Sequence, residues 1–498
     1  MTSRPARRLQ IVGTDGRPLR LSAAYDGAST GRRINIRAPS GGPNIHLTAA
    51  LQTLINRARQ AYRNNPWIAS AIERGTVNEI GTGIIPRAKT GDSGLNQAML
   101  ELWDDWAPEA DADGVLDIYG LQSLASRNRR MAGEVFIRLR PRRLEDGLAV
   151  PLQVQVLESE HVPVTLNQVL PSGNLIRHGI EFDRMGRRTA YWMYRQHPGE
   201  STGFGLVDIG RTVRVPASMV IHHYAPQRPG QIRGEPEATR ALFRGHVFEE
   251  YEDAELDRKK NKAQFTGFIR KPPMEYSEDD WKYNPVTGEP LTEDADGVPL
   301  LDVQPGTFPS LLPGEEIQFA SGDDTGSGYA DFQREQKFAL AAALSTPYEL
   351  LTGDYRNVND RLIRAVLQEY RRQIEMIQDQ ITIQQVCRGV RNAWLEQAVL
   401  AGMLPISSQE YARNRRQYQR CEWRPQGWPY MHPEQDINAA LAAISGGLSS
   451  RAAEVAKRGF DVEEVDQQNA TDQQRAESLG LSYAASQPPA PTPEQSNE

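Results

Sequence analysis

The chain is built around two neighbouring segments, ADFQREQKFALAAAL (330–344) and NDRLIRAVLQEYRRQIEMIQDQITIQQVCRGVRNAWLEQAVL (359–400). The first is rich in alanine and lacks Gly and Pro. It predicts a helix that stops before Pro347, because proline has no N–H to donate. The second opens on Asn359 and Asp360, good N-cap residues, and its apolar residues then recur every three or four positions. The sequence therefore predicts two helices joined by a short loop.

The second of these predicted helices is unusually long. As one continuous rod it would measure roughly 60 Å at about 1.5 Å per residue, more than the diameter of a small domain. Gly389 is the expected position of a kink, because glycine weakens the interior of a helix. Periodicity alone leaves two interpretations open: the core helix of a two-domain enzyme, or the spine of an elongated subunit.

Composition narrows the class of protein. The chain has 498 residues, a hydrophobic content of 39% and a mean hydropathy of −0.58, which indicates much polar surface, either solvated or buried between subunits. The net charge of −7 argues against a protein that grips DNA tightly. Cys387 and Cys421 have neither metal-ligand spacing nor a disulfide framework, and with no signal peptide they indicate synthesis in a reducing cytosol. No apolar run approaches the ~20 residues of a transmembrane helix, so no membrane partner is expected.

The first half of the chain alternates between helical and strand-like patterns. Residues 1–44 form a basic arm rich in arginine, predicted to be flexible, which either contacts DNA or an acidic partner or is a solvated tail. Helical patterns follow at 46–81, with a break near Pro66, and then at 95–106 and 121–131. Strands are predicted at 134–140, 152–157, 179–182, 189–194, 213–215 and 219–224. Together they predict an α+β domain with a mostly antiparallel sheet.

A small domain is nested between two helices in the middle of the chain. Helical periodicity runs from 235 to about 263 and ends on a basic run that includes Lys259, Lys260 and Lys262. A loop-rich segment with several turn signals follows, and the chain then returns through the helix at 330–344. The two helices must lie side by side to carry this segment out and back.

Catalytic motifs are missing from the sequence. It has no phosphate-binding GxxxxGK[ST] loop, no GxGxxG after a strand and no HExxH. Glu158, Glu160 and His161 could hold a metal, but a surface turn is the better interpretation, because neighbours on a strand point to opposite faces. Of the adjacent His222 and His223, one is expected in the core and one exposed. No cofactor or metal is therefore expected, and the chain is not predicted to be an enzyme.

Short motifs in order along the chain resemble the portal proteins of tailed bacteriophages, specifically the lambda-like family. The matching motifs are Asn64-Asn65-Pro66-Trp67, Gly81-Thr82-Gly83-Ile84, Ala132-Gly133-Glu134-Val135-Phe136, Glu158-Ser159-Glu160-His161, Arg228-Pro229-Gly230-Gln231, Leu312-Pro313-Gly314-Glu315 and Pro347-Tyr348-Glu349-Leu350-Leu351-Thr352-Gly353-Asp354. They cover about 57–470. One departure follows residue 359, where many relatives carry Tyr-Ser-Ser and this chain has Asp360-Arg361-Leu362.

The resemblance implies an elongated portal-type subunit of α+β class. Its parts would be a flexible basic arm (1–44), the wing (45–234), stem helix 1 (235–265), the clip (266–327), stem helix 2 (328–344), the tunnel loop (345–358), the long spine helix (359–402), a mostly helical crown (403–475) and a disordered tail (476–498). Portal subunits form a ring, twelve-fold in virions, at one capsid vertex, and double-stranded DNA passes through its axial channel.

The resemblance also implies partners. The clip would dock the large terminase motor and later the head–tail connector, the ring would contact the major capsid or scaffolding protein, and assembly would take place in the cytoplasm of a bacterial host. A channel that lets DNA slide must not bind it well, and a net charge of −7 per subunit repels DNA within a Debye length of about 8–10 Å. The candidates for local contact with DNA are Lys259, Lys260, Lys262, Arg356 and Asn357. The lysines face either the duplex or a neighbouring subunit.

The leading hypothesis is therefore a non-catalytic portal ring that conducts DNA during packaging and ejection. Two alternatives belong to other classes: a metal-dependent nuclease or similar DNA-processing enzyme, and a head–tail adaptor without a channel. Metal-dependent cleavage of DNA distinguishes the first alternative, and the absence of annular particles distinguishes the second.

Overall fold

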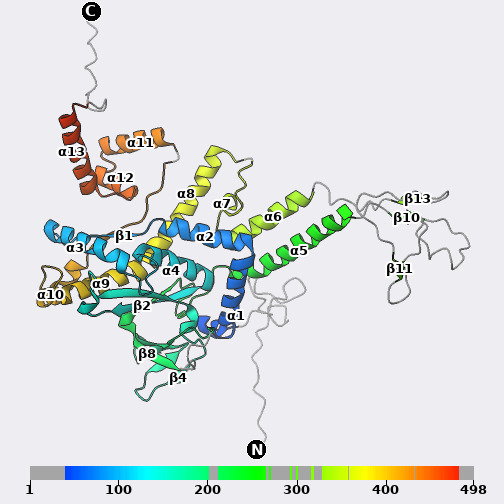
Figure 1. Ribbon diagram of the computed structural model, residues 1–498, viewed down its shortest axis with the longest axis horizontal. Helices are drawn as coiled ribbons and strands as arrows, with labels where there is room; N and C mark the ends of the chain where they lie inside the picture. The colour runs from blue at the N-terminus through cyan, green and yellow to red at the C-terminus, as the bar shows by residue number, and fades with distance from the viewer. Residues whose placement is uncertain are drawn as a thin grey trace, which may run out of the picture.

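The computed structural model describes residues 40–200, 211–264, 268–270, 292–293, 299–300, 316–318, 328–356, 358–430 and 432–481. Within these residues the chain is α+β, as predicted. A body of helices and antiparallel strands carries two projecting helices on one side, and a group of C-terminal helices lies against another side (Figure 1). Among the described helices, none is both long and apolar enough to cross a bilayer.

Four helices of the body precede the first long strand. They are α1 (Pro43–Asn64), α2 (Pro66–Ile80), α3 (Ser93–Trp106) and α4 (Ile118–Ala132). The predicted break is confirmed at Asn65, whose side chain accepts hydrogen bonds from the backbone N–H groups of Trp67 and Ile68 and so caps α2. Helix α4 ends at Gly133, whose φ of 87° and close approach to the backbone of Glu235 exclude any residue with a Cβ.

The predicted strands form two sheets rather than one. The first has the order β3 (Leu152–Leu157), β2 (Glu134–Pro141), β9 (Val220–Tyr224). The second runs in chain order through β4 (Gln168–Val169), β5 (Leu175–Arg177), β6 (Ile180–Phe182), β7 (Arg188–Tyr194) and β8 (Thr212–Pro216). All pairings within both sheets are antiparallel, as predicted. Strands β4 and β5 were not predicted, because two or three mostly exposed residues carry no detectable alternation.

The main core of the body lies between α3, α4, the first sheet and α9 (Arg388–Leu400). Three tryptophans meet there: the Trp103 and Trp106 ring centroids are 5.0 Å apart, and Trp394 lies 5.2 Å from Trp103. Aromatic contacts of this kind contribute about 0.5–1.5 kcal/mol each beyond the burial of area. The C-terminal end of the predicted long helix is thus packed against α3, α4 and the first sheet.

Two antiparallel helices, α5 (Thr239–Gln264) and α6 (Gly328–Ala343), project from the body side by side, as predicted (Figure 1). Tyr251 of α5 packs edge-on against Phe332 of α6 at 5.0 Å. In the segment that they carry, β10 (Phe268–Arg270) pairs with β13 (Glu316–Gln318), and β11 (Thr292–Glu293) with β12 (Pro299–Leu300). These strands pair with each other and not with the sheets of the body, which agrees with a nested domain.

The segment between α6 and the long helix differs from the expected open loop. It contains α7 (Tyr348–Thr352), whose Tyr348 and Leu351 are buried against α2 and α6. Residues 353–356 and 358–359, between α7 and the next helix, belong to no helix or strand. The predicted loop therefore holds a packed helical turn and a shorter exposed tip.

The long helix is present, but its irregularity is not at Gly389. It consists of α8 (Asp360–Ile377), a π-helix (Gln378–Cys387) and α9 in direct succession. Gly389 lies inside α9, where an added Cβ would stand 2.7 Å from Cδ1 of Ile221. The predicted kink is wrong: this glycine allows β9 to approach the helix, and the distortion falls in the preceding ten residues.

The C-terminal region is mostly helical. It comprises α10 (Ser408–Tyr418), α11 (Pro433–Ser445), α12 (Arg451–Lys457) and α13 (Val462–Leu479), and a short strand, β14 (Cys421–Arg424), pairs with β1 (Ile85–Ala88). Helix α13 includes the first four residues of the predicted tail, 476–479. Predictions for the arm before residue 40 and for the tail beyond 481 lie outside the described residues.

Candidate functional site

The predicted DNA-channel lysines lie at the far end of α5, where the chain leaves for the nested segment. The Lys259 Nζ is 3.9 Å from a Glu255 carboxylate oxygen and 4.7 Å from the ring centroid of Tyr329. The Lys260 Nζ is 3.4 Å from an Asp257 oxygen. Lys262 belongs to α5, but its side chain lies outside the described residues. Both described lysines are about half exposed. Ion pairs between exposed side chains contribute at most about 1 kcal/mol to stability. A phosphate can therefore replace the carboxylate as the partner of either lysine.

The tip of the segment after α7 holds the predicted Arg356, whose side chain is 86% exposed. It folds back onto Asp354 in a bidentate ion pair, with Nε–Oδ1 and Nη2–Oδ2 distances of 2.8 and 2.9 Å. These bonds, together with one from the Arg356 backbone N–H, hold the pKa of Asp354 well below its ordinary value. The arginine is therefore neutralised within its own loop. Asn357 lies outside the described residues.

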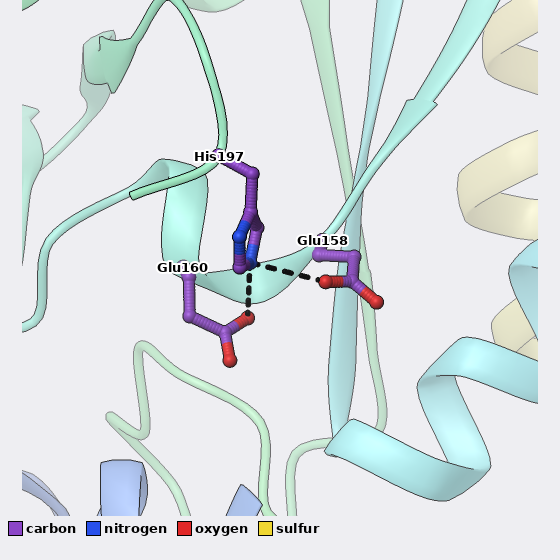
Figure 2. A group of neighbouring side chains, drawn as sticks. All are labelled: Glu158, Glu160 and His197. Carbon is purple, nitrogen blue, oxygen red and sulfur yellow. Dashed lines mark ion pairs between the residues drawn. The ribbon is translucent and has the colours of Figure 1, made fainter. Parts of the chain in front are cut away.

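The metal-binding candidate from the sequence, Glu158 with Glu160 and His161, has a different third member in the structure. Residues Ser159–His161 form a short 3-10 turn rather than a strand, and the side chains of Glu158 and Glu160 converge on His197 (Figure 2). The His197 Nε2 is 3.1 Å from Glu158 Oε2 and 3.9 Å from Glu160 Oε2. His161 is not part of this group; it is buried with its ring against that of His197. The predicted turn is confirmed, but Ser159 and His161 within it are buried and do not lie at the surface. The argument from opposite strand faces does not apply, because these residues do not continue the strand.

Arg59 of α1 fills the space between the two carboxylates. Its Nη2 is 2.9 Å from Glu160 Oε2 and 3.3 Å from Glu158 Oε2, and Nη1 also bonds Glu160. Burial alone would raise the pKa of Glu160, but the bonds from Arg59 lower it below its ordinary value. A guanidinium on the oxygens that a cation would use repels that cation. The cluster is therefore an ion-pair network that joins α1 to the turn after β3 and to the segment after β7.

Both adjacent histidines are buried, so the prediction of one exposed side chain is wrong. Strand β9 is covered on both faces: His222 stacks on Phe136, and His223 faces the π-helix. The His222 Nε2 is 2.9 Å from Glu134 Oε2, and the His223 Nδ1 is 3.0 Å from Gln385 Oε1. Burial lowers the pKa of His222 to about 4 and that of His223 to about 3. Both rings are neutral at neutral pH.

A buried charge network that the sequence analysis missed joins α2, α4, the start of α5 and the π-helix. Glu79 of α2 is fully buried, and its Oε2 accepts bonds from Arg129 Nη2 at 2.8 Å and Arg130 Nη2 at 2.6 Å. The same two arginines bond Glu237, just before α5, at 2.9 and 2.8 Å. Thr382 of the π-helix donates to the remaining Glu79 oxygen. Although burial disfavours a charged carboxylate, the arginines hold the pKa of Glu79 well below its ordinary value.

A sequence signal for this network existed. Arg129 follows Leu121 and Ala125 at intervals of four, on the face of α4 that its apolar residues mark as buried. An arginine on that face requires a buried acid, because an unpaired buried charge is costly. The partner, however, is 50 residues away in sequence, and no local pattern identifies it.

Comparison with known proteins places this geometry in a family. The model of the lambda family of phage portal proteins matches residues 30–378, more than half of the chain. The chain belongs to this family. A probable portal protein of Halomonas phage phiHAP-1 is 27% identical over 443 residues, covering 86% of this chain and 82% of the relative. Portal protein B of Escherichia phage lambda is 25% identical over 176 residues, 35% of this chain and 33% of its own length.

Solved structures match this chain less closely than these sequences do. The neck of a native gene transfer agent particle matches with a TM-score of 0.46 and 13% identity, over 85% of this chain and 95% of that one. An HK97 family phage portal protein from Corynebacterium diphtheriae matches with a TM-score of 0.30 and 12% identity, over 68% and 89% of the two chains. The family assignment of this portal protein rests on the sequence comparisons.

Proposed function

We propose that this portal protein forms a twelve-fold ring at one capsid vertex of a virion, through which double-stranded DNA enters during packaging and leaves during ejection. It acts as a conduit without catalytic activity, and a separate terminase chain supplies the motor. The clip docks that motor and later the head–tail connector, and the wing contacts the major capsid or scaffolding protein. Assembly takes place in the bacterial host cytoplasm.

The observation that carries this proposal is the uncovered outer face of α5. Phe243 and Val247, one turn apart on this face, are 81% and 47% exposed, on a helix whose buried Ala241 and Phe248 pack against α6 and the body. Apolar side chains at this density on a projecting helix favour a protein partner. A head-to-tail ring places the same heterologous contact at every subunit boundary, so one stem can cover the next.

The electrostatics of the stem agree with a conduit. The described lysines of α5 and the exposed Arg356 each already have a carboxylate within the same helix or loop. Such groups can touch a phosphate without holding it, since each returns to its own partner. The net charge of −7 per subunit adds a repulsive background.

The test is the particle that purified protein forms. Mass photometry and negative-stain microscopy are expected to show annular particles, and Phe243→Asp with Val247→Asp is expected to shift them to monomers. The matched control is Val77→Asp, a 62% exposed apolar residue of α2 outside this face. A wild-type chain that remains monomeric at high concentration would contradict the proposal. So would cleavage of duplex DNA upon addition of Mg²⁺ or Mn²⁺.

A second experiment tests the loop tip. Residues 354–357 are replaced by Gly-Ser-Gly-Ser, which keeps α7 and its buried Tyr348 and Leu351. Rings are expected to form as before, whereas packaging or retention of DNA is impaired. Failure of ring assembly would show that the tip is a structural element.

A further inference from the structure

A cavity of about 560 Å³ lies between α9, α10 and β14 and is lined mainly by polar and cationic side chains. Its wall consists of Lys89, Arg388, Asn392, Arg416, Gln419, Arg420, Cys421, Glu422 and Trp423. Glu422, the one carboxylate in that list, already bonds Lys89 at 3.4 Å and Arg424 at 3.3 Å. Arg388, Arg416 and Arg420 are exposed, and none of the three forms an ion pair within the described part of the chain.

A fourth arginine lies next to this cavity and is buried. Arg391 is 2% exposed, and it donates to neutral acceptors, the Gln419 carbonyl oxygen at 3.4 Å and the Met99 sulfur at 3.9 Å. Burial without a carboxylate lowers the pKa of this guanidinium. Its charge and that of Arg388 also reach the cavity wall, where they oppose the burial that raises the pKa of the Cys421 thiol. A buried charge of this kind is stabilised when an anion approaches.

The chemistry of the wall selects an anion with several charges. Guanidinium groups bind carboxylates and phosphates through paired hydrogen bonds, and three of them stand around one opening. We propose that this cavity binds an extended acidic peptide segment of another protein, whose carboxylates pair with Arg388, Arg416 and Arg420.

Two features favour a peptide over a nucleic acid. Residues 421–423 of the wall belong to β14, which among the described strands pairs with β1 alone, so an extended chain can align with its other edge. The cavity also lies at the end of the body opposite to α5 and α6 (Figure 1). In the proposed ring this end faces away from the channel, toward a surrounding shell protein. That placement rests on the proposed function, whereas the charge argument does not.

The test is fluorescence anisotropy with the full-length protein and a fluorescein-labelled decapeptide, (Glu-Ser)₅. We expect saturable binding that weakens as NaCl is raised, and no binding of (Gln-Ser)₅. Arg416→Gln with Arg420→Gln is expected to weaken binding about tenfold or more, from the loss of two charge-assisted contacts. The matched control is Arg413→Gln with Arg195→Gln, which removes two exposed arginines outside the cavity, one of them on the same helix.

Each other outcome overturns the proposal. These outcomes are equal weakening by the control pair, equal binding of the neutral peptide, or tighter binding of a labelled 12-nucleotide single strand that the Arg416/Arg420 variant abolishes. Arg388→Glu on α9 provides a second variant, and circular dichroism confirms that each variant is folded. Mass photometry on the same samples separates the two proposals. Rings without peptide binding remove only this inference, and peptide binding without rings removes the proposed function.

Discussion

The projecting parts of this portal protein and its body contain different kinds of ion pair. On α5 and at the tip after α7, cations pair with acids two to four residues away and remain largely exposed, as in Lys260–Asp257 and Arg356–Asp354. In the body, Glu79 and Glu134 are fully buried and bond arginines 50 to 99 residues away. Exposed local pairs exchange partners at little cost, whereas buried long-range pairs fix the relative positions of whole elements.

Glu79 tests how much the buried ion pairs of the body stabilise the fold. Glu79→Gln leaves Arg129 and Arg130 with only Glu237, and we expect the free energy of unfolding to fall by about 3–5 kcal/mol, because charges remain buried without their partner. Urea denaturation at a fixed protein concentration measures the loss. The control is Glu369→Gln on α8, where an 80% exposed carboxylate lies 3.5 Å from Arg372 and contributes at most about 0.5 kcal/mol. Similar losses for both variants would show that burial does not separate the two kinds of pair.

The two buried histidines, His222 and His223, should make the stability of the body depend on pH. Their folded pKa values, about 4 and about 3, lie below the unfolded value of about 6.5, so the unfolded chain binds more protons as the pH falls. Stability is therefore full above about pH 6.5 and decreases below it, by about 2 kcal/mol per histidine at pH 5. Urea denaturation at pH 7 and pH 5 measures this. His223→Gln should remove about half of the loss, and the exposed His246→Gln should leave it unchanged.

A smaller effect is expected where β9 meets the long helix. Gly389→Ala places a methyl group 2.7 Å from Cδ1 of Ile221 and should destabilise the protein by about 1–3 kcal/mol, the usual result of overpacking. Ile221→Val removes that Cδ1 atom, so the double variant should be less unstable than the sum of the single variants. Thermal unfolding of all four proteins measures the coupling. Additive losses would mean that the two residues do not contact each other.

Local patterns predicted the elements of this chain well and their charges poorly. The break at Asn65, the paired helices and the extent of the long helix follow from caps, periodicity and proline, which act over a few residues. The burial of both histidines does not follow, because it depends on the π-helix 160 residues later in the sequence covering the second face of β9. Gly389 illustrates the same limit, since its role is set by Ile221 and not by its own helix.

In the candidate site, too, contacts between sequence neighbours were predictable and contacts between distant residues were not. Arg356 was identifiable as a basic residue in a Gly- and Asp-rich segment, and the bidentate bond to Asp354 lies within reach of sequence reasoning because the partners are two residues apart. The convergence of Glu158, Glu160 and His197 was not identifiable, because a 3-10 turn and Arg59 from another helix create it. Sequence distance between partners, more than residue type, determined what could be predicted.

The smallest expected effect lies at the loop tip and tests the projecting side of the comparison. Asp354→Asn releases Arg356 from its partner, so assembled protein should bind a short duplex more tightly at low salt. The slope of log affinity against log salt should steepen by about one for each phosphate contacted. Arg356→Gln in the same background should remove the gain, while the free energy of unfolding by urea is the same with and without this second change, because the Arg356 side chain is 86% exposed. Fluorescence anisotropy over a salt series measures the slope.

An unchanged slope with Arg356 released would mean that this side chain does not reach the DNA. The Arg356–Asp354 ion pair would then maintain the shape of the loop, and it would not reduce the affinity of the loop for phosphate.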